Sequence, residues 1–256
     1  MVSDSLALMR LSRFHLLCAA VVALPSICVH AAPAANPAIE PAAAALVKSV
    51  ATKLEAATTV ALQARHTLHP SLGSGNNLDK GPIAITMARP NKFHAVQPAG
   101  RETREIAYDG STFIVMSPQL GHHATAKLPA KSMDELASML DKQFGFRPPV
   151  AELLSENLPA TLFSDATSAK VLGVESIGWK RYEHVQIVQK GMITDIWIGS
   201  KDKLPHRLLY TYTDLPGNPT WDIGLTKWKL NAPVDTAAFS KKPAADSMPV
   251  QMLKAR

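Results

Sequence analysis

Histidine is the residue type in this sequence best suited to bind a metal or move a proton. Seven histidines follow residue 31: His66, His69, His94, His122, His123, His184 and His206. A metal site needs several of them to converge with carboxylates, but His66 and His69 lie an odd number of positions apart on a predicted strand and so point to opposite faces. The adjacent His122 and His123 diverge in the same way. We interpret the histidines as solvent-facing or singly hydrogen-bonded, in preference to the alternative of a metal site, and expect no cofactor.

The motifs that position catalytic groups are missing from the sequence. It contains no Gly-x-Ser-x-Gly nucleophile elbow, no zincin helix and no phosphate-binding loop. Gly73-Ser74-Gly75 lies in a loop without a following helix, so we interpret it as a flexible hairpin tip. Asp134-Glu135 falls in the first turn of a predicted helix, where carboxylates complement the helix dipole. We therefore expect no catalytic residues and no enzymatic activity.

Residues 1–31 have the three-part pattern of a secretory signal peptide. Arg10 and Arg13 are followed by an apolar stretch over 14–24 and by small residues that end at Ala31. The stretch is shorter than the roughly 20 residues that a membrane-spanning helix needs, and no later segment comes close. We expect cleavage after Ala31 or one residue later, export to the periplasm, and no transmembrane segment.

Both cysteines, Cys18 and Cys28, lie inside the predicted signal peptide. The exported chain would contain no thiol, which excludes disulfides, cysteine nucleophiles and thiolate metal sites. Ile27 precedes Cys28, whereas bacterial lipoprotein sites place Gly, Ala or Ser before the lipid-bearing cysteine. Lipid anchoring is therefore not expected.

Composition indicates an ordinary globular protein. Of the 256 residues, 46% are hydrophobic and 19% are charged, which argues against disorder. The 27 Lys and Arg and 21 Asp and Glu are scattered, without a basic cluster interleaved with aromatics, so no nucleic-acid partner is expected. We predict a flexible Ala/Pro segment over 32–41 and a single domain over 42–256.

The spacing of apolar residues changes along this domain from a helical period to a strand period and back. A first helix is predicted from the stripe of Ile39 to Leu54, a second from the capping box of Ser132 and Glu135 with its stripe to Phe144, and a short third one around 150–154 after Pro148-Pro149. Short alternating segments predict strands at 58–69, 83–87, 93–97, 104–108, 112–117, 123–128, 170–177, 181–189, 192–199, 206–213 and 221–230. The fold class is mainly β with α, an antiparallel sheet of about eleven strands that curls around a few helices.

Such a sheet presents a concave apolar surface larger than its helices can fill, which is a natural site for a hydrophobic ligand. Apolar alternation identifies five candidate ligand-binding residues on the strands: Leu62, Ile85, Phe113, Trp197 and Tyr210. The helix over 133–144 presents Leu136, Met139 and Leu140 as the facing stripe. The alternative for each residue taken singly is ordinary core packing.

Several short motifs resemble those of the periplasmic lipoprotein carriers of the LolA/LppX-like superfamily. They are the turn Arg89-Pro90-Asn91-Lys92-Phe93, the hairpin Tyr108-Asp109-Gly110-Ser111-Thr112 and the ending Val234 to Phe239 before Pro243. The stretch 107–121, with Asp195 to Ile198, Leu204 to Arg207 and Trp228, is more similar to an uncharacterised family of secreted bacterial proteins in that superfamily.

This resemblance implies an eleven-stranded half-barrel whose helices form a lid over a hydrophobic cavity. In the carriers, the arginine of the Arg-Pro-Asn turn helps to hold the lid helices, and Arg89 occupies the matching position. The function it implies is a periplasmic carrier or binder of a lipid-like ligand or acylated protein. The alternative is a protein-binding or regulatory module that recognises an envelope protein, because one fold supports several functions.

Overall fold

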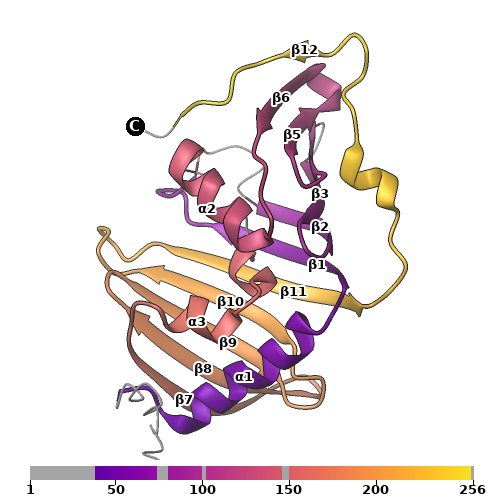
Figure 1. The fold of residues 1–256 in the computed structure, drawn as a ribbon. Coiled ribbons are helices and arrows are strands. Elements are labelled where there is room, and N and C mark those ends of the chain that lie inside the picture. Colours follow the sequence, from indigo (N-terminus) through magenta and orange to yellow (C-terminus); the bar gives the residue numbers. More distant parts are fainter. Residues whose placement is uncertain (1–37, 74–79, 100–101, 146–149, 255–256) are drawn as a thin grey trace, which may run out of the picture. The chain divides into compact units, whose positions relative to one another are not determined.

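The computed structural model describes residues 38–73, 80–99, 102–145 and 150–254 (Figure 1). The chain divides into two units, Met1–Ala35 and Asn36–Arg256, and only the second contains described residues. The predicted signal peptide, most of the Gly73–Gly81 loop and Pro148-Pro149 lie outside the described ranges. None of the helices within those ranges has the length and apolarity needed to cross a membrane.

Twelve strands form one sheet, in the order β12-β6-β5-β4-β3-β2-β1-β11-β10-β9-β8-β7. Neighbours are antiparallel except for the short β12, which lies parallel to β6. In chain order the strands are β1 (Thr59–Leu68), β2 (Lys80–Ala88), β3 (Lys92–Ala99), β4 (Glu102–Tyr108), β5 (Thr112–Ser117), β6 (His122–Lys127), β7 (Ala166–Ile177), β8 (Lys180–Gln189), β9 (Met192–Gly199), β10 (Pro205–Tyr212), β11 (Thr220–Leu230) and β12 (Met248–Pro249). The sheet is open, with β12 and β7 at its edges, which confirms the predicted mainly β class.

The predicted first and second helices are present at nearly the expected bounds. The helices are α1 (Pro41–Glu55), η2 (Pro118–Leu120), α2 (Met133–Phe144), η3 (Ala151–Leu154), α3 (Leu158–Phe163) and η4 (Thr236–Ser240). The sequence did not predict α3 or η4. Each has at most six residues, which is too short for an apolar period to show.

The start of the domain corrects one expectation. Residues 38–41 were assigned to a flexible segment, but Ile39 bridges Ala169 of β7, Glu40 is the N-cap of α1, and Pro41 is its first residue. The Glu40 amide donates to the Ala169 carbonyl at 2.9 Å, and the Ala169 amide donates to Ala38 at 3.1 Å. These backbone bonds hold the first described residues against the edge of the sheet.

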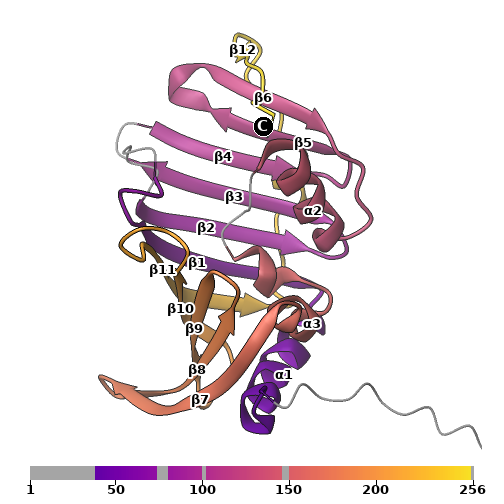
Figure 2. The ribbon, with the colours of Figure 1, turned by 90° about the vertical axis from the view of Figure 1, so that its left-hand side faces the viewer.

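The three α-helices lie on the same side of the sheet (Figure 2). The main hydrophobic core fills the space between them and the inner face, which is the sheet face that the helices cover. Val47 and Leu54 of α1 belong to the same core as inward residues of the sheet such as Val185, Ile196 and Leu208, all fully or nearly fully buried. Strand alternation determines which side chains take part in this core.

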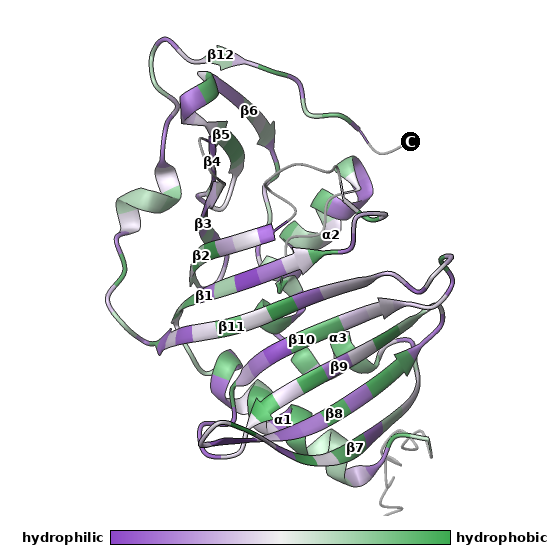
Figure 3. Cartoon of the chain, turned by 180° about the vertical axis from the view of Figure 1, so that it is seen from behind, coloured by the Kyte–Doolittle hydropathy of each residue, from purple (hydrophilic) through white to green (hydrophobic). Residues whose placement is uncertain are grey.

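The opposite face, called here the outer face, differs between the two halves of the sheet in what lies over it. Over β3 and β4 it is covered by η4 of the C-terminal segment, whose Phe239 is buried. Over β7 to β11 polar and apolar residues alternate along each strand (Figure 3). Strands β1 and β11 join the two halves by an antiparallel pairing of residues more than 150 positions apart.

Candidate functional site

Helix α2 is the element that the predicted ligand site requires, and its N-terminus is capped by its own side chains. The Ser132 hydroxyl accepts from the Glu135 amide at 3.1 Å, and Glu135 Oε2 accepts from the Lys131 amide at 2.7 Å. This capping box satisfies two amides at the beginning of the helix. The helix ends at Gly145, which has a left-handed backbone with φ of 61°. One face of α2 is thus directed at the sheet, with Met133, Leu136 and Leu140 buried.

A narrow pocket between α2 and the inner face is lined by described residues. A residual cavity of about 10 Å³ is lined by Phe93, Phe113, Met133, Leu136, Ala137, Leu140, Ala151 and Leu154. A volume of this size accommodates about one water molecule. All eight lining residues are apolar, so the site is a hydrophobic interface.

The structure brings together only part of the predicted ligand-binding set. Phe113, Leu136 and Leu140 line the cavity. Leu62, Ile85 and Tyr210 are buried in the same core but do not line the cavity, and Met139 is partly buried and packs against that core.

Trp197 is placed on the wrong face by the sequence analysis. Its neighbours Ile196 and Ile198 belong to the core under the helices, so Trp197 points to the outer face. An aromatic residue within an alternating strand does not by itself reveal which face is covered, because both faces of β9 are buried here. Trp197 therefore does not belong to the site under α2.

Arg89 links the end of α1 to the segment that follows η3. Its Nε donates to the Ala57 carbonyl at 3.2 Å, and its Nη2 donates to the carbonyls of Leu54 at 3.2 Å and Ser155 at 3.3 Å. The cation thus lies at the carboxyl end of a helix, where the helix dipole favours positive charge. Its buried Nη1 has no hydrogen-bond partner among the described residues.

The two other landmark motifs hold the chain just before α2. The Tyr108 hydroxyl donates to the Leu128 carbonyl at 2.6 Å and accepts from the Ala130 amide at 3.0 Å. Asn91 Nδ2 donates to the Ala130 carbonyl at 2.7 Å. Gly110, with φ of 103°, lies so close to Asn91 that an added Cβ would be 3.0 Å from its Nδ2. Polar bonds therefore fix the entry to α2, whereas the helix body rests mainly on apolar contacts.

The outer face holds a polar cluster that the sequence analysis missed. His184 Nδ1 lies 2.6 Å from Glu175 Oε1, and His184 Nε2 lies 2.8 Å from Asp195 Oδ1. The Trp197 ring stacks on His184 with centroids 4.2 Å apart, and Arg207 lies 4.6 Å from its centroid. Carboxylates only accept hydrogen bonds, so a ring nitrogen is the donor in each hydrogen bond to these carboxylates. The available signal was on β8, where the polar His184 and Gln186 alternate with the apolar Val185 and Ile187.

Charge partners in this cluster shift two pKa values. The hydrogen bond from Trp197 Nε1, at 2.9 Å, lowers the pKa of Glu175, and the neighbouring His184 lowers it further against a smaller opposing effect of burial. Two hydrogen bonds to Asp222, at 2.9 and 2.8 Å, raise the pKa of Arg207. The groups satisfy one another, which is the pattern of a structural network.

The hydrogen bonds of two histidines differ from what the sequence predicted. His184 is bonded at both nitrogens, and so is His66, whose Nε2 lies 2.9 Å from Gln97 and whose Nδ1 accepts from Trp221 at 3.2 Å. The expectation of singly bonded or solvent-facing histidines is wrong for these two. Within the described ranges, no group of three or more His, Cys, Asp or Glu residues is arranged to hold a metal ion.

Comparison with known proteins identifies the family. A family model described as "Predicted periplasmic protein (DUF2092)" matches residues 43–253. The chain belongs to the DUF2092 family. This agrees with the expected similarity to an uncharacterised family of exported bacterial proteins. No curated protein gives a significant match to the chain.

Solved structures similar to this DUF2092 chain include two mycobacterial lipoproteins. LppX of Mycobacterium tuberculosis is 16% identical, with a TM-score of 0.47, over 77% of this chain and 99% of that one. LprF of Mycobacterium bovis is 14% identical, with a TM-score of 0.46, over 80% and 99%. A LolA superfamily protein of Nitrosomonas europaea is 11% identical, with a TM-score of 0.31, over 78% and 97%.

Proposed function

We propose that this protein binds the apolar part of a lipid-like molecule, free or attached to an acylated protein, between α2 and the inner face of the sheet. It would act in the periplasm as a carrier or binding protein, without catalysis. The observation that carries the proposal is the apolar interface under α2, in which Leu136 and Leu140 face Phe93 and Phe113 around a small residual cavity.

An acyl chain that enters under α2 would displace the helix from the inner face. The cavity of about 10 Å³ is far too small for an acyl chain. The bonds of Tyr108 and Asn91 hold the entry to the helix, so the start of α2 would act as the pivot. Further along, the helix body is held mainly by side chains such as Leu136 and Leu140, which an acyl chain could replace with equivalent apolar contacts.

Burial of an acyl chain under α2 would supply enough free energy for measurable binding. Burial contributes about 0.8 kcal/mol per methylene, so about ten methylenes would contribute roughly 8 kcal/mol. The cost of association and the cost of displacing α2 are subtracted from this value. Because the open form is the one that binds, the apparent affinity depends on how often α2 is open.

The test measures binding of a fluorescent fatty-acid analogue to wild type and Leu140→Ala. Leu140 is fully buried under α2, so its truncation weakens the closed form by roughly 3 kcal/mol. We expect the apparent affinity to rise at least about tenfold, because the open fraction rises. The matched control is Leu158→Ala in α3, an equally buried leucine away from α2, for which we expect no tightening.

Two further variants address the site itself. Met139→Glu places a charge beside the apolar stripe and is expected to abolish binding, whereas Ser138→Glu adds the same charge at an exposed neighbouring position and leaves binding intact. Arg89→Leu is expected to alter affinity or release. Absence of wild-type binding in folded protein would overturn the proposal and favour the protein-binding alternative.

A further inference from the structure

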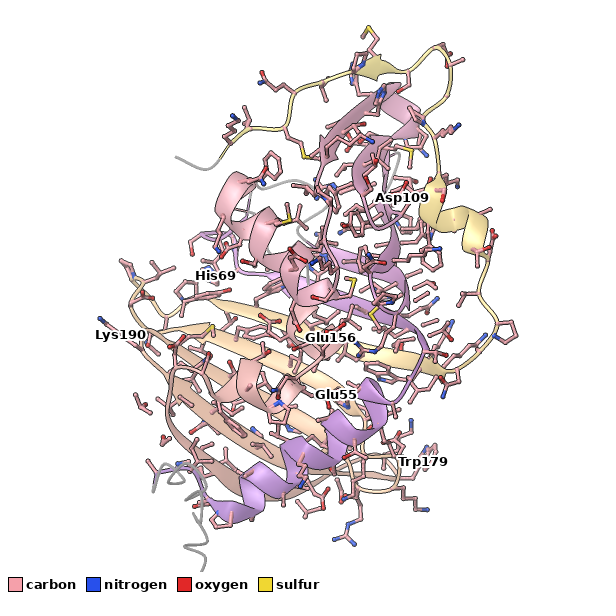
Figure 4. The ribbon with its side chains drawn as sticks, viewed as in Figure 1. Glu55, His69, Asp109, Glu156, Trp179 and Lys190 are labelled. Atoms are coloured by element: carbon pink, nitrogen blue, oxygen red, sulfur yellow. The ribbon has the colours of Figure 1, made fainter. Side chains whose placement is uncertain are left out.

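The turn between β7 and β8 carries an unusual amount of exposed apolar surface. Trp179, in the turn itself, is 88% exposed (labelled in Figure 4), and Ile177 and Val174 are 55% and 51% exposed. Leu172 on the same strand is also exposed. Large apolar side chains gathered at one point of a surface indicate an interaction site. We call residues 172–181 the β7–β8 tip.

Positive charge surrounds this apolar tip. Among the described residues, Lys180, Arg181 and the nearby Lys201 form no ion pair, although Lys180 Nζ lies 5.3 Å from the Trp179 ring centroid. The acidic residues of the same region are engaged by partners: Glu175 by His184, Glu183 by Lys203 and Asp202 by His206. The tip therefore presents three cations beside an indole ring, none of which forms an ion pair among the described residues.

The tip borders a groove and stands on a rigid base. A groove of about 510 Å³ beside the tip is lined by three cations, one carboxylate that is hydrogen-bonded to His206, and two aromatic rings, among others: Lys180, Arg181, Lys201, Asp202, Trp179 and Tyr182. The Ser200 amide donates to the Arg181 carbonyl at 3.0 Å, and the Glu175–His184–Asp195 network joins β7, β8 and β9 behind the tip. Such a base presents the exposed side chains in a fixed arrangement.

We propose that the β7–β8 tip docks the protein onto a membrane surface that contains anionic phospholipid. Trp179 would enter the interfacial layer, where indole rings are favoured, and Lys180, Arg181 and Lys201 would contact the lipid phosphates. The groove beside them offers space for a headgroup.

The distribution of the apolar side chains favours a membrane over an acidic peptide as the partner. Val174 and Ile177 lie an odd number of positions apart on a regular part of β7, so they leave opposite faces of the sheet. A single peptide could cover only one of these faces, whereas a fluid interface surrounds both. This docking is independent of the ligand site under α2, because the two surfaces share no residue.

The experiment measures co-sedimentation of the exported protein with vesicles of phosphatidylglycerol and phosphatidylcholine, and with vesicles of phosphatidylcholine alone. We expect binding to the anionic vesicles only, weakening with added salt. Because each basic residue near an anionic surface contributes about fivefold in affinity, the double variant Lys180→Gln/Arg181→Gln should bind roughly 25-fold more weakly. The matched control Lys80→Gln/Lys92→Gln removes two exposed lysines elsewhere on the sheet and should bind within about twofold of wild type.

Tryptophan fluorescence provides a readout that a structural defect would not mimic. Wild-type emission should shift to shorter wavelength on anionic vesicles, and Trp179→Phe should bind but lose the shift. Of the other three tryptophans, Trp197 is buried, and Trp221 and Trp228 are partly buried on β11 with their indole nitrogens hydrogen-bonded within the sheet. Trp179→Ala should weaken binding by roughly tenfold because its apolar burial is lost.

Three results would overturn the proposal. They are equal binding to both kinds of vesicle, unchanged binding of the Lys180/Arg181 variant, and Trp179-dependent binding of a labelled oligoglutamate peptide together with no vesicle binding. The last result would assign the tip to a protein partner. Fatty-acid binding measured without vesicles tests the site under α2 separately, so the failure of one proposal is distinguishable from the failure of the other.

Discussion

Replacing Arg89 by leucine tests whether one side chain couples α1 to the segment after η3. The guanidinium donates three hydrogen bonds, to the carbonyls of Leu54, Ala57 and Ser155. At about 1.5 kcal/mol for each bond from a charged donor, their loss costs about 4.5 kcal/mol. The variant also removes the buried Nη1, which has no partner among the described residues. Its desolvation penalty of about 1–2 kcal/mol disappears, which offsets part of the loss. The net loss of unfolding free energy is therefore about 3 kcal/mol.

Urea unfolding followed by circular dichroism measures this loss. A domain of this size loses about 2–4 °C in Tm per kcal/mol, so Arg89→Leu should also lower Tm by about 6–12 °C. The control is Arg65→Leu, which removes an exposed arginine that forms no ion pair among the described residues and should change stability by less than about 0.5 kcal/mol. A loss below about 1 kcal/mol for Arg89→Leu would refute the view that this arginine joins the two segments.

Two more predictions concern the anchors of α2 and of the C-terminal segment. Gly110→Ala should lower the unfolding free energy by about 1–3 kcal/mol, and by more than Gly217→Ala does. Both glycines have positive φ, but of the two only Gly110 has a neighbour, Asn91, in the path of the new Cβ. Equal losses in thermal unfolding would contradict the predicted contact. Burial would raise the pKa of Glu105, but hydrogen bonds from Lys241, at 2.6 Å, and His94, at 2.8 Å, outweigh it and lower that pKa. A folded-state pKa below the ordinary value of 4.5 means that this stabilisation is complete above pH 4.5 and is lost as the pH falls through the depressed value. Stability measured between pH 6 and pH 3 should therefore fall less steeply in Glu105→Gln than in wild type, and parallel curves would show that Glu105 does not contribute.

Much of the fold could be predicted from local patterns, because the strands alternate and their turns contain Gly, Asn, Asp and Pro. The capping box at Ser132 and Glu135 placed the start of α2 correctly. The two-residue β12 carries no periodicity, and its pairing with β6 depends on where the chain after η4 returns. Such an element is determined by tertiary contacts rather than by local sequence.

The candidate site was less predictable than the fold. Strand alternation placed Phe113, and the helical stripe placed Leu136, on faces that the structure buries in the core. Neither pattern could distinguish an open cavity from a filled one, because the same residues line both. Trp197 shows a second limit. Its face depends on which side the helices cover, and on β9 the outer face is also buried, by His184 and Arg207.

The pairing of β1 with β11 has a consequence for how the chain acquires its structure. These strands lie side by side at the middle of the sheet, yet Leu68 pairs with Trp221 across more than 150 residues. Contacts of such long range form late, because closing a long loop costs entropy before any contact repays it. Each half of the sheet can assemble from local hairpins as the polypeptide is made, but the exposed edge of β1 must wait for Thr220–Leu230. A chain shortened before that strand would keep an unpaired edge, which is a template for association with other chains.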